Sequence, residues 1–231
     1  MATSPDSVTT TLDPSSTLVI VTGACALAAV AVDVVWRRSR SVVTIVHEAG
    51  HALVALLTGR RLRGIRLHSD TSGLTLSVGK PRGPGMVATA AAGYLSPSLV
   101  GLAGVGLLAI DQVTIMLWAG TAVLVGMLLL IRNLYGAVLL VATGAIVVAV
   151  SFYATARVQA AFGYGVTWFL LLGAVRPIVE LRRERRRRPG MRSDADTLAR
   201  LTPLPAGLWV ALFGLLTVGA LVAGGWLLLA A

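Results

Sequence analysis

The stretch TIVHEAGHALVALLTG, residues 44–59, places two of the chain's three histidines and one glutamate inside an otherwise apolar run. On insertion scales, a charged side chain at the centre of a membrane-spanning helix costs about 2.5–3.5 kcal/mol. Ionisable residues at such positions generally mark a functional site. His47, Glu48 and His51 are therefore the first candidates for function.

The composition is that of an integral membrane protein. Of the 231 residues, 56% are hydrophobic and only 13% are charged, which is about half the charged fraction of a soluble domain. The net charge of +10 favours anionic lipid headgroups over nucleic acid, because the basic residues cluster between apolar runs and the chain has no nucleic-acid motif. The sequence therefore predicts the lipid bilayer as a partner and no nucleic acid.

The apolar runs predict an all-α polytopic membrane protein with about seven transmembrane helices and a small β-hairpin after the second. Residues 1–16 are polar and rich in Ser, Thr and Pro, which predicts a disordered tail before one membrane domain at 17–231. The predicted spans are Thr17–Trp36, Ser41–Gly59, Gly85–Ile110, Val113–Ile131, Leu134–Ala154, Val158–Val175 and Ala206–Ala230.

Two segments between the spans carry structure of their own. Residues 65–78, IRLHSDTSGLTLSV, alternate in polarity around a turn and predict a hairpin at about 63–79. A basic loop is expected at about 176–193. In the next residues Ser193 is placed to cap a short helix over 194–201, which Pro203 and Pro205 would end.

Seven alternating spans place most loop arginines on the side of the hairpin and of the 193–201 segment. The positive-inside rule then predicts that this side is cytoplasmic, with the N-terminus inside and the C-terminus outside. The first span alone predicts the opposite orientation, because it has no basic residue before it and Arg37, Arg38 and Arg40 after it.

His47 and His51 are four residues apart, so on a helix they lie on one face about one turn from each other. Two imidazoles in that arrangement can share one tetrahedral metal ion. Glu48 is offset by about 100°, where it can reach a metal-bound water without being a ligand. The sequence therefore predicts a Zn²⁺ site with Glu48 as general base, and the alternative is a hydrogen-bonded helix-packing cluster without metal.

HEAGH within a transmembrane helix, followed by a short β-hairpin, resembles the site-2 protease family of intramembrane zinc metallopeptidases, in a less characterised bacterial branch. The resemblance implies that His47 and His51 are zinc ligands, that Glu48 is the catalytic base and that the site opens towards the cytoplasm of a bacterial cell. It also implies a distant aspartate as third ligand. The family's usual L-D-G stretch and N-x-x-P element are absent, and the nearest segment is SDADTLARLT at 193–202.

Elimination points to the same segment for the third ligand, which a catalytic zinc site usually requires. Asp33 and Asp111 belong to the opposite side, and Asp33 is placed to pair with Arg37. The remaining acidic residues and His68 fall in the tail, among arginines or near the hairpin turn. Asp194 is favoured and Asp196 is second, although either would also stabilise the first turn of a helix.

Two further features have two interpretations each. The run AAGYLSPSLVG at 91–101 is either irregular backbone beside a substrate cavity or a helix-packing surface of small residues. Asn133 is either a substrate-orienting amide or an interfacial cap.

The function predicted from these features is a membrane-embedded zinc metalloendopeptidase, a hydrolase that acts on membrane proteins. The family resemblance implies single-span membrane proteins as substrates. The alternative is a non-proteolytic membrane transporter or metal-binding scaffold. The intact Glu48 favours the enzyme, because metal storage does not need a general base. The sequence contains no convincing internal repeat of the kind that many transporters have.

Overall fold

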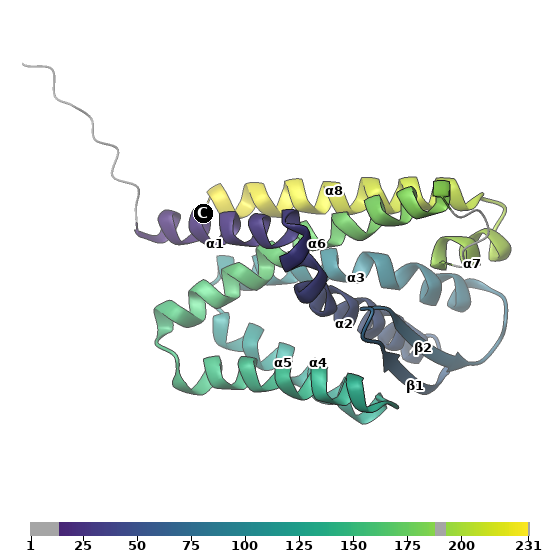
Figure 1. The fold of residues 1–231 in the computed structure, drawn as a ribbon, viewed down its shortest axis with the longest axis horizontal. Helices are drawn as coiled ribbons and strands as arrows, with labels where there is room; N and C mark the ends of the chain where they lie inside the picture. Colours follow the sequence, from purple (N-terminus) through teal and green to yellow (C-terminus); the bar gives the residue numbers. More distant parts are fainter. Residues whose placement is uncertain (1–13, 188–192, 231) are drawn as a thin grey trace, which may run out of the picture.

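In the computed structural model, the described residues, 14–187 and 193–230, form eight helices and one antiparallel hairpin (Figure 1). The helices are α1 (Pro14–Ala31), α2 (Asp33–Leu57), α3 (Pro84–Ala109), α4 (Val113–Leu130), α5 (Leu134–Tyr153), α6 (Ala156–Arg187), α7 (Asp194–Leu201) and α8 (Ala206–Ala230). The strands are β1 (Arg61–Leu67) and β2 (Gly73–Val78). Of the predicted tail, residues 1–13 lie outside the described residues.

The predicted fold class, an all-α polytopic membrane protein with a small hairpin, is confirmed. Among the described residues, six helices are long and apolar enough to cross a membrane: α2, α3, α4, α5, α6 and α8. The hairpin follows α2, as predicted, and the hairpin and α7 lie at one end of the molecule (Figure 1).

Seven alternating spans would make the first and second spans run in opposite directions, and this expectation is wrong. Helix α1 ends at Ala31, Val32 is extended, and α2 already begins at Asp33. Figure 1 shows α1 and α2 following one another towards the hairpin end, so that α1 begins where α8 terminates. The N-terminal end of the described chain is therefore at the end of the molecule opposite the hairpin.

Side chains of α6 hold this bend. Arg176 donates to the carbonyl of Val30, which the break in the helix leaves open, and pairs with Asp33. The predicted partner of Asp33 was Arg37, so that expectation is wrong. The seven-span scheme placed Arg40 on the side opposite the hairpin. In the structure, a guanidinium nitrogen of Arg40 lies 3.5 Å from a carboxylate oxygen of Glu180 in α6.

The sixth span does not end at Val175, and the segment from 176 is not a loop. Helix α6 continues through Pro177 to Arg187. Arginine has a high helix propensity, and the basic residues of the last turn oppose the negative end of the helix dipole. The remainder of the predicted loop, 188–192, lies outside the described residues.

Helix α3 is continuous from Pro84 to Ala109, including Pro97. The interpretation of 91–101 as irregular backbone is therefore wrong, and small residues here serve close packing. A Cβ on Gly101 would lie 2.9 Å from Leu171, and one on Gly104 would lie 2.6 Å from the hydroxyl of Thr167.

The hairpin is held between α2 and the turn that joins α4 to α5. On β1, Ile65 and Leu67 are buried in an apolar cluster with Ile45 of α2 and Met127 of α4. The side-chain amide of Asn133 pairs with the backbone of Leu67, donating to the carbonyl at 2.6 Å and accepting from the N–H at 3.2 Å. Asn133 thus binds the outer edge of β1, and it does not line the cavity described below.

Helix α7 begins and ends as the sequence predicts. Ser193 and Asp196 form a reciprocal capping box at its start. Ala195 and Leu198 are fully buried in a cluster formed by α3, α6, α7 and α8. This packing brings the first residue of α7, Asp194, towards α2 and α3.

Candidate metal centre

The two histidines of α2 point their outer ring nitrogens at each other. The Nε2 atoms of His47 and His51 are 3.1 Å apart, and the rings are nearly perpendicular. Neutral imidazole carries one lone pair for a metal ion, and here both rings direct one nitrogen to the same point. The i, i+4 spacing thus produces the shared face that the sequence predicts.

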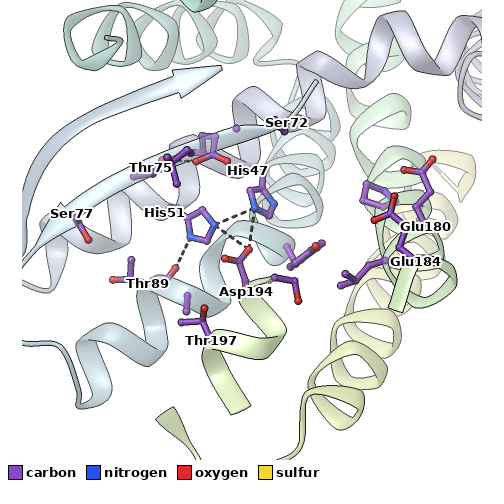
Figure 2. Close-up of a pocket in the computed structure, with 18 of the residues that line it drawn as sticks. His47, His51, Ser72, Thr75, Ser77, Thr89, Glu180, Glu184, Asp194 and Thr197 are labelled. Carbon is purple, nitrogen blue, oxygen red and sulfur yellow. Dashed lines mark hydrogen bonds and ion pairs between the residues drawn. The ribbon is translucent and has the colours of Figure 1, made fainter. Parts of the chain in front are cut away.

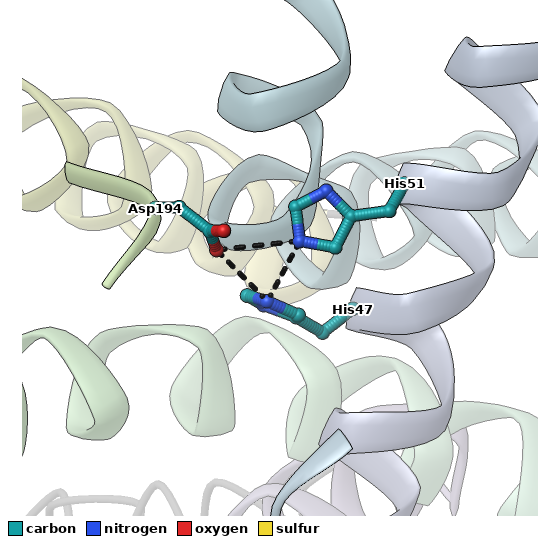
Figure 3. A group of neighbouring side chains, drawn as sticks. All are labelled: His47, His51 and Asp194. Carbon is teal, nitrogen blue, oxygen red and sulfur yellow. Dashed lines mark hydrogen bonds and ion pairs between the residues drawn. The ribbon is translucent and has the colours of Figure 1, made fainter. Parts of the chain in front are cut away.

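Asp194 completes a triangle of donor atoms (Figure 3). Its Oδ2 lies 3.2 Å from His47 Nε2 and 3.3 Å from His51 Nε2. With bonds of about 2.0–2.1 Å, two ligands of a tetrahedral zinc ion are about 3.3 Å apart. The three separations in the structure match that value, so this donor set fits such an ion.

A carbonyl of α3 fixes the protonation of His51. Its Nδ1 lies 2.7 Å from the backbone oxygen of Thr89. Because a carbonyl only accepts hydrogen bonds, Nδ1 carries the proton and the Nε2 lone pair of the neutral ring stays free. Metal-binding histidines commonly have such an outer partner.

Helix α3 leaves room for the donor atoms only because residue 93 is a glycine. A Cβ there would lie 2.3 Å from His51 Nε2 and 2.6 Å from His47 Nε2. The next residue, Tyr94, packs edge-on against His47 at 5.0 Å and stacks on Phe213 of α8. The histidine rings are therefore bounded by α3 and supported from α8.

The two aspartates of α7 have different surroundings. Burial would raise the pKa of Asp194, but hydrogen bonds with His47 and His51 outweigh it and hold this pKa well below its usual range. Asp196 caps the helix through Ser193 and pairs with Arg185. Burial would raise the pKa of Asp196, but its hydrogen bonds with Arg185 and Ser193 outweigh this effect and lower the pKa. Asp196 is not part of the donor triangle.

Glu48 is buried beside this centre, with 4% of its surface exposed. Its Oε2 accepts a hydrogen bond of 2.6 Å from the hydroxyl of Thr75 on β2. Glu48 is not one of the three donors, yet it lines the same cavity of about 510 Å³. Figure 2 shows this cavity with Thr75 on one side of the histidines and Asp194 on another. Its walls come from α2, β2, α3, α6 and α7.

Among the described residues, the other acidic side chains and the third histidine are not part of the donor triangle. In the exposed hairpin turn, His68 and Asp70 both form hydrogen bonds with Ser72, and the hydrogen bonds that Ser72 donates to Asp70 lower the pKa of Asp70. Glu180 lines the far side of the cavity, where it pairs with Arg176 and accepts a hydrogen bond from Trp36.

Sequence reasoning did not identify four residues around the centre: Gly73, Thr75, Thr89 and Gly93. The positions of Thr75 and Thr89 depend on how β2 and α3 pack on α2, and neither belongs to a motif. For Gly93, the only sequence signal was its place in the small-residue run at 91–101.

A membrane protein that gathers two histidines and an aspartate beside a buried glutamate has the donor set of a metallohydrolase. In a comparison with protein families, the chain matches Peptidase M50B-like over residues 20–224. The chain belongs to this family, which makes it a membrane metallopeptidase of the site-2 protease type. No curated protein and no solved structure matched the chain.

Proposed function

We propose that the protein is a zinc endopeptidase that hydrolyses peptide bonds of single-span membrane proteins. His47, His51 and Asp194 hold the zinc ion, and Glu48 is the general base. The observation that carries the proposal is the triangle of donor atoms with edges of 3.1–3.3 Å, in one cavity with a carboxylate that is not a donor.

Zinc at this position would supply a Lewis acid that activates water and polarises the scissile carbonyl. Glu48 takes a proton from the attacking water and delivers it to the leaving nitrogen, as the C–O bond forms and the peptide C–N bond breaks. The carbonyl of Thr89 keeps the proton of His51 on Nδ1 throughout.

The detergent-purified protein should contain about one zinc ion per chain, as a mononuclear site requires. It should cleave a single-span reporter protein, lose this activity with a zinc chelator and regain it when zinc is returned. Metal content and cleavage are measured on the same preparation. A protein that holds zinc but cleaves none of a panel of single-span reporters would support the scaffold alternative instead.

We further propose that the site faces the cytoplasm. The hairpin end of the molecule carries the basic residues that flank the hairpin and those of the last turns of α6, whereas Arg157 is the only basic residue of the described chain at the opposite end. Such an asymmetry orients a membrane protein with its basic end inside.

This orientation predicts the labelling of single cysteines in intact cells, in a background where Cys25 is replaced by alanine. Ser72→Cys in the hairpin turn should be protected from a membrane-impermeant thiol reagent. Thr155→Cys, in the exposed turn between α5 and α6, should react. Both should react after the cells are permeabilised, and the reverse pattern in intact cells would place the site outside.

A further inference from the structure

We propose that Thr75 is a positioning residue that holds the carboxylate of Glu48 in the orientation needed for proton transfer. The inference rests on the proposed role of Glu48 as general base. It gives the hairpin a defined part in the reaction, as the rigid support of the base.

The contacts of Glu48 define both oxygens of its carboxylate. Oε2 accepts the 2.6 Å hydrogen bond from the Thr75 hydroxyl. Oε1 lies over Gly73, where a Cβ would be only 2.4 Å away. Strand β2 therefore provides a donor for one oxygen and an open position for the other, and Oε1 is the oxygen left for proton transfer.

The strand cannot easily shift along α2, because both of its ends are fixed. Before β2, Thr44 of α2 donates to the carbonyl of Thr71 at 2.8 Å. At the other end, the buried Arg60 donates to the hydroxyl of Ser77 at 3.0 Å and to the carbonyl of Lys80 at 2.6 Å. One end of β2 is thus held by α2 before Glu48, and the other end is held by the segment that joins α2 to β1.

The strand register also determines which way Thr75 faces. Thr75 is opposite Ile65 in the antiparallel pair, and directly paired residues point to the same face of a sheet. Ile65 is fully buried against Ile45 and Met127. A one-residue slip would move Ile65 out of this cluster and turn Thr75 away from Glu48.

A hydrogen bond to an ionised carboxylate is among the stronger protein hydrogen bonds. Without it the flexible glutamate side chain can adopt other rotamers, and a base displaced by about 1 Å loses on the order of 100-fold in rate. The hydroxyl of Thr75 therefore acts on turnover through Glu48, with no contact to the reacting atoms required.

Thr75→Val keeps the size and branching of the side chain and removes the hydroxyl. We expect kcat for the single-span reporter to fall about 10- to 100-fold, with KM and zinc content within about threefold of the parent. Thr75→Ser restores the hydroxyl and should recover kcat to within about threefold. Thr143→Val is the matched control, because that hydroxyl donates to the carbonyl of Leu139 in its own helix, away from the donor triangle.

Gly73→Ala tests the other oxygen, since its methyl group would displace Oε1. It should lower kcat while zinc remains bound. In a Glu48→Gln background, Thr75→Val should cause little further loss, because the group that it positions is already inactive.

The outcomes separate this inference from the proposed function. If the parent cleaves the reporter and Thr75→Val retains full kcat, the positioning role is wrong and the protease assignment stands. Equal losses in Thr75→Val and Thr75→Ser would also overturn it, because the serine keeps the hydroxyl. A zinc-bound parent that does not cleave contradicts the proposed function itself.

Discussion

Glu48→Gln should reduce cleavage of a single-span reporter by about 10²–10⁴-fold while leaving zinc content near that of the parent. A positioned general base contributes an effect of this size. Glutamine has nearly the same size and can still accept the hydrogen bond from Thr75, but it cannot take up a proton at neutral pH. Because Glu48 is not one of the three donors, its substitution should not weaken metal binding.

The measurement is a single-turnover cleavage assay and a metal analysis on the same purified variant. Thr143→Val again serves as a control for handling and folding, since it lies in α5. A Glu48→Gln protein that cleaves at the parental rate would contradict the role of general base. If the variant loses both cleavage and zinc, Glu48 acts on the metal site and not on proton transfer alone.

Asp194→Asn should bind zinc at least about 100-fold more weakly. Loss of an outer partner of a metal ligand already weakens binding by up to about 100-fold, and Asp194 is proposed as a ligand itself. The substitution removes the negative charge from the donor triangle, where Oδ2 lies within 3.3 Å of both histidine nitrogens. Cleavage should fall with the metal content. His47→Ala should behave in the same way, because it removes a donor atom outright.

Asp196→Asn provides the matched comparison two residues away. Asp196 caps α7 and pairs with Arg185, so its substitution should cost about 1 kcal/mol of helix stability or less and leave zinc binding nearly intact. Equilibrium zinc titration of the two variants against a competing chelator measures both effects. Loss of metal in Asp196→Asn, with retention in Asp194→Asn, would falsify the choice of third ligand.

The parts of the centre that are local in sequence were predictable. The four-residue spacing of His47 and His51 requires a shared face on any helix. Ser193 and the prolines after Leu201 delimit α7, because capping and termination depend on neighbouring residues. The choice of Asp194 followed from excluding other acidic residues, and the structure places it with the histidines.

The errors arose where distant groups determine the backbone. The bend at Val32 is held by Arg176, which is far away in the sequence, so hydropathy alone suggested two antiparallel spans. Helix α6 passes Pro177 although proline there removes one backbone donor. Thr75 and Gly93 contact the centre only through the packing of β2 and α3 on α2, and no spacing rule identifies them.

The donor atoms come from opposite ends of the chain, with the histidines in α2 and Asp194 near the start of α7. A ribosome makes α2 long before it makes α7, so a growing chain lacks the third donor until most of its membrane segments have been synthesised. Premature termination before α7 would leave a product with the histidines and the base but without this aspartate. The three donor atoms can therefore come together only late in synthesis, once α7 has been made.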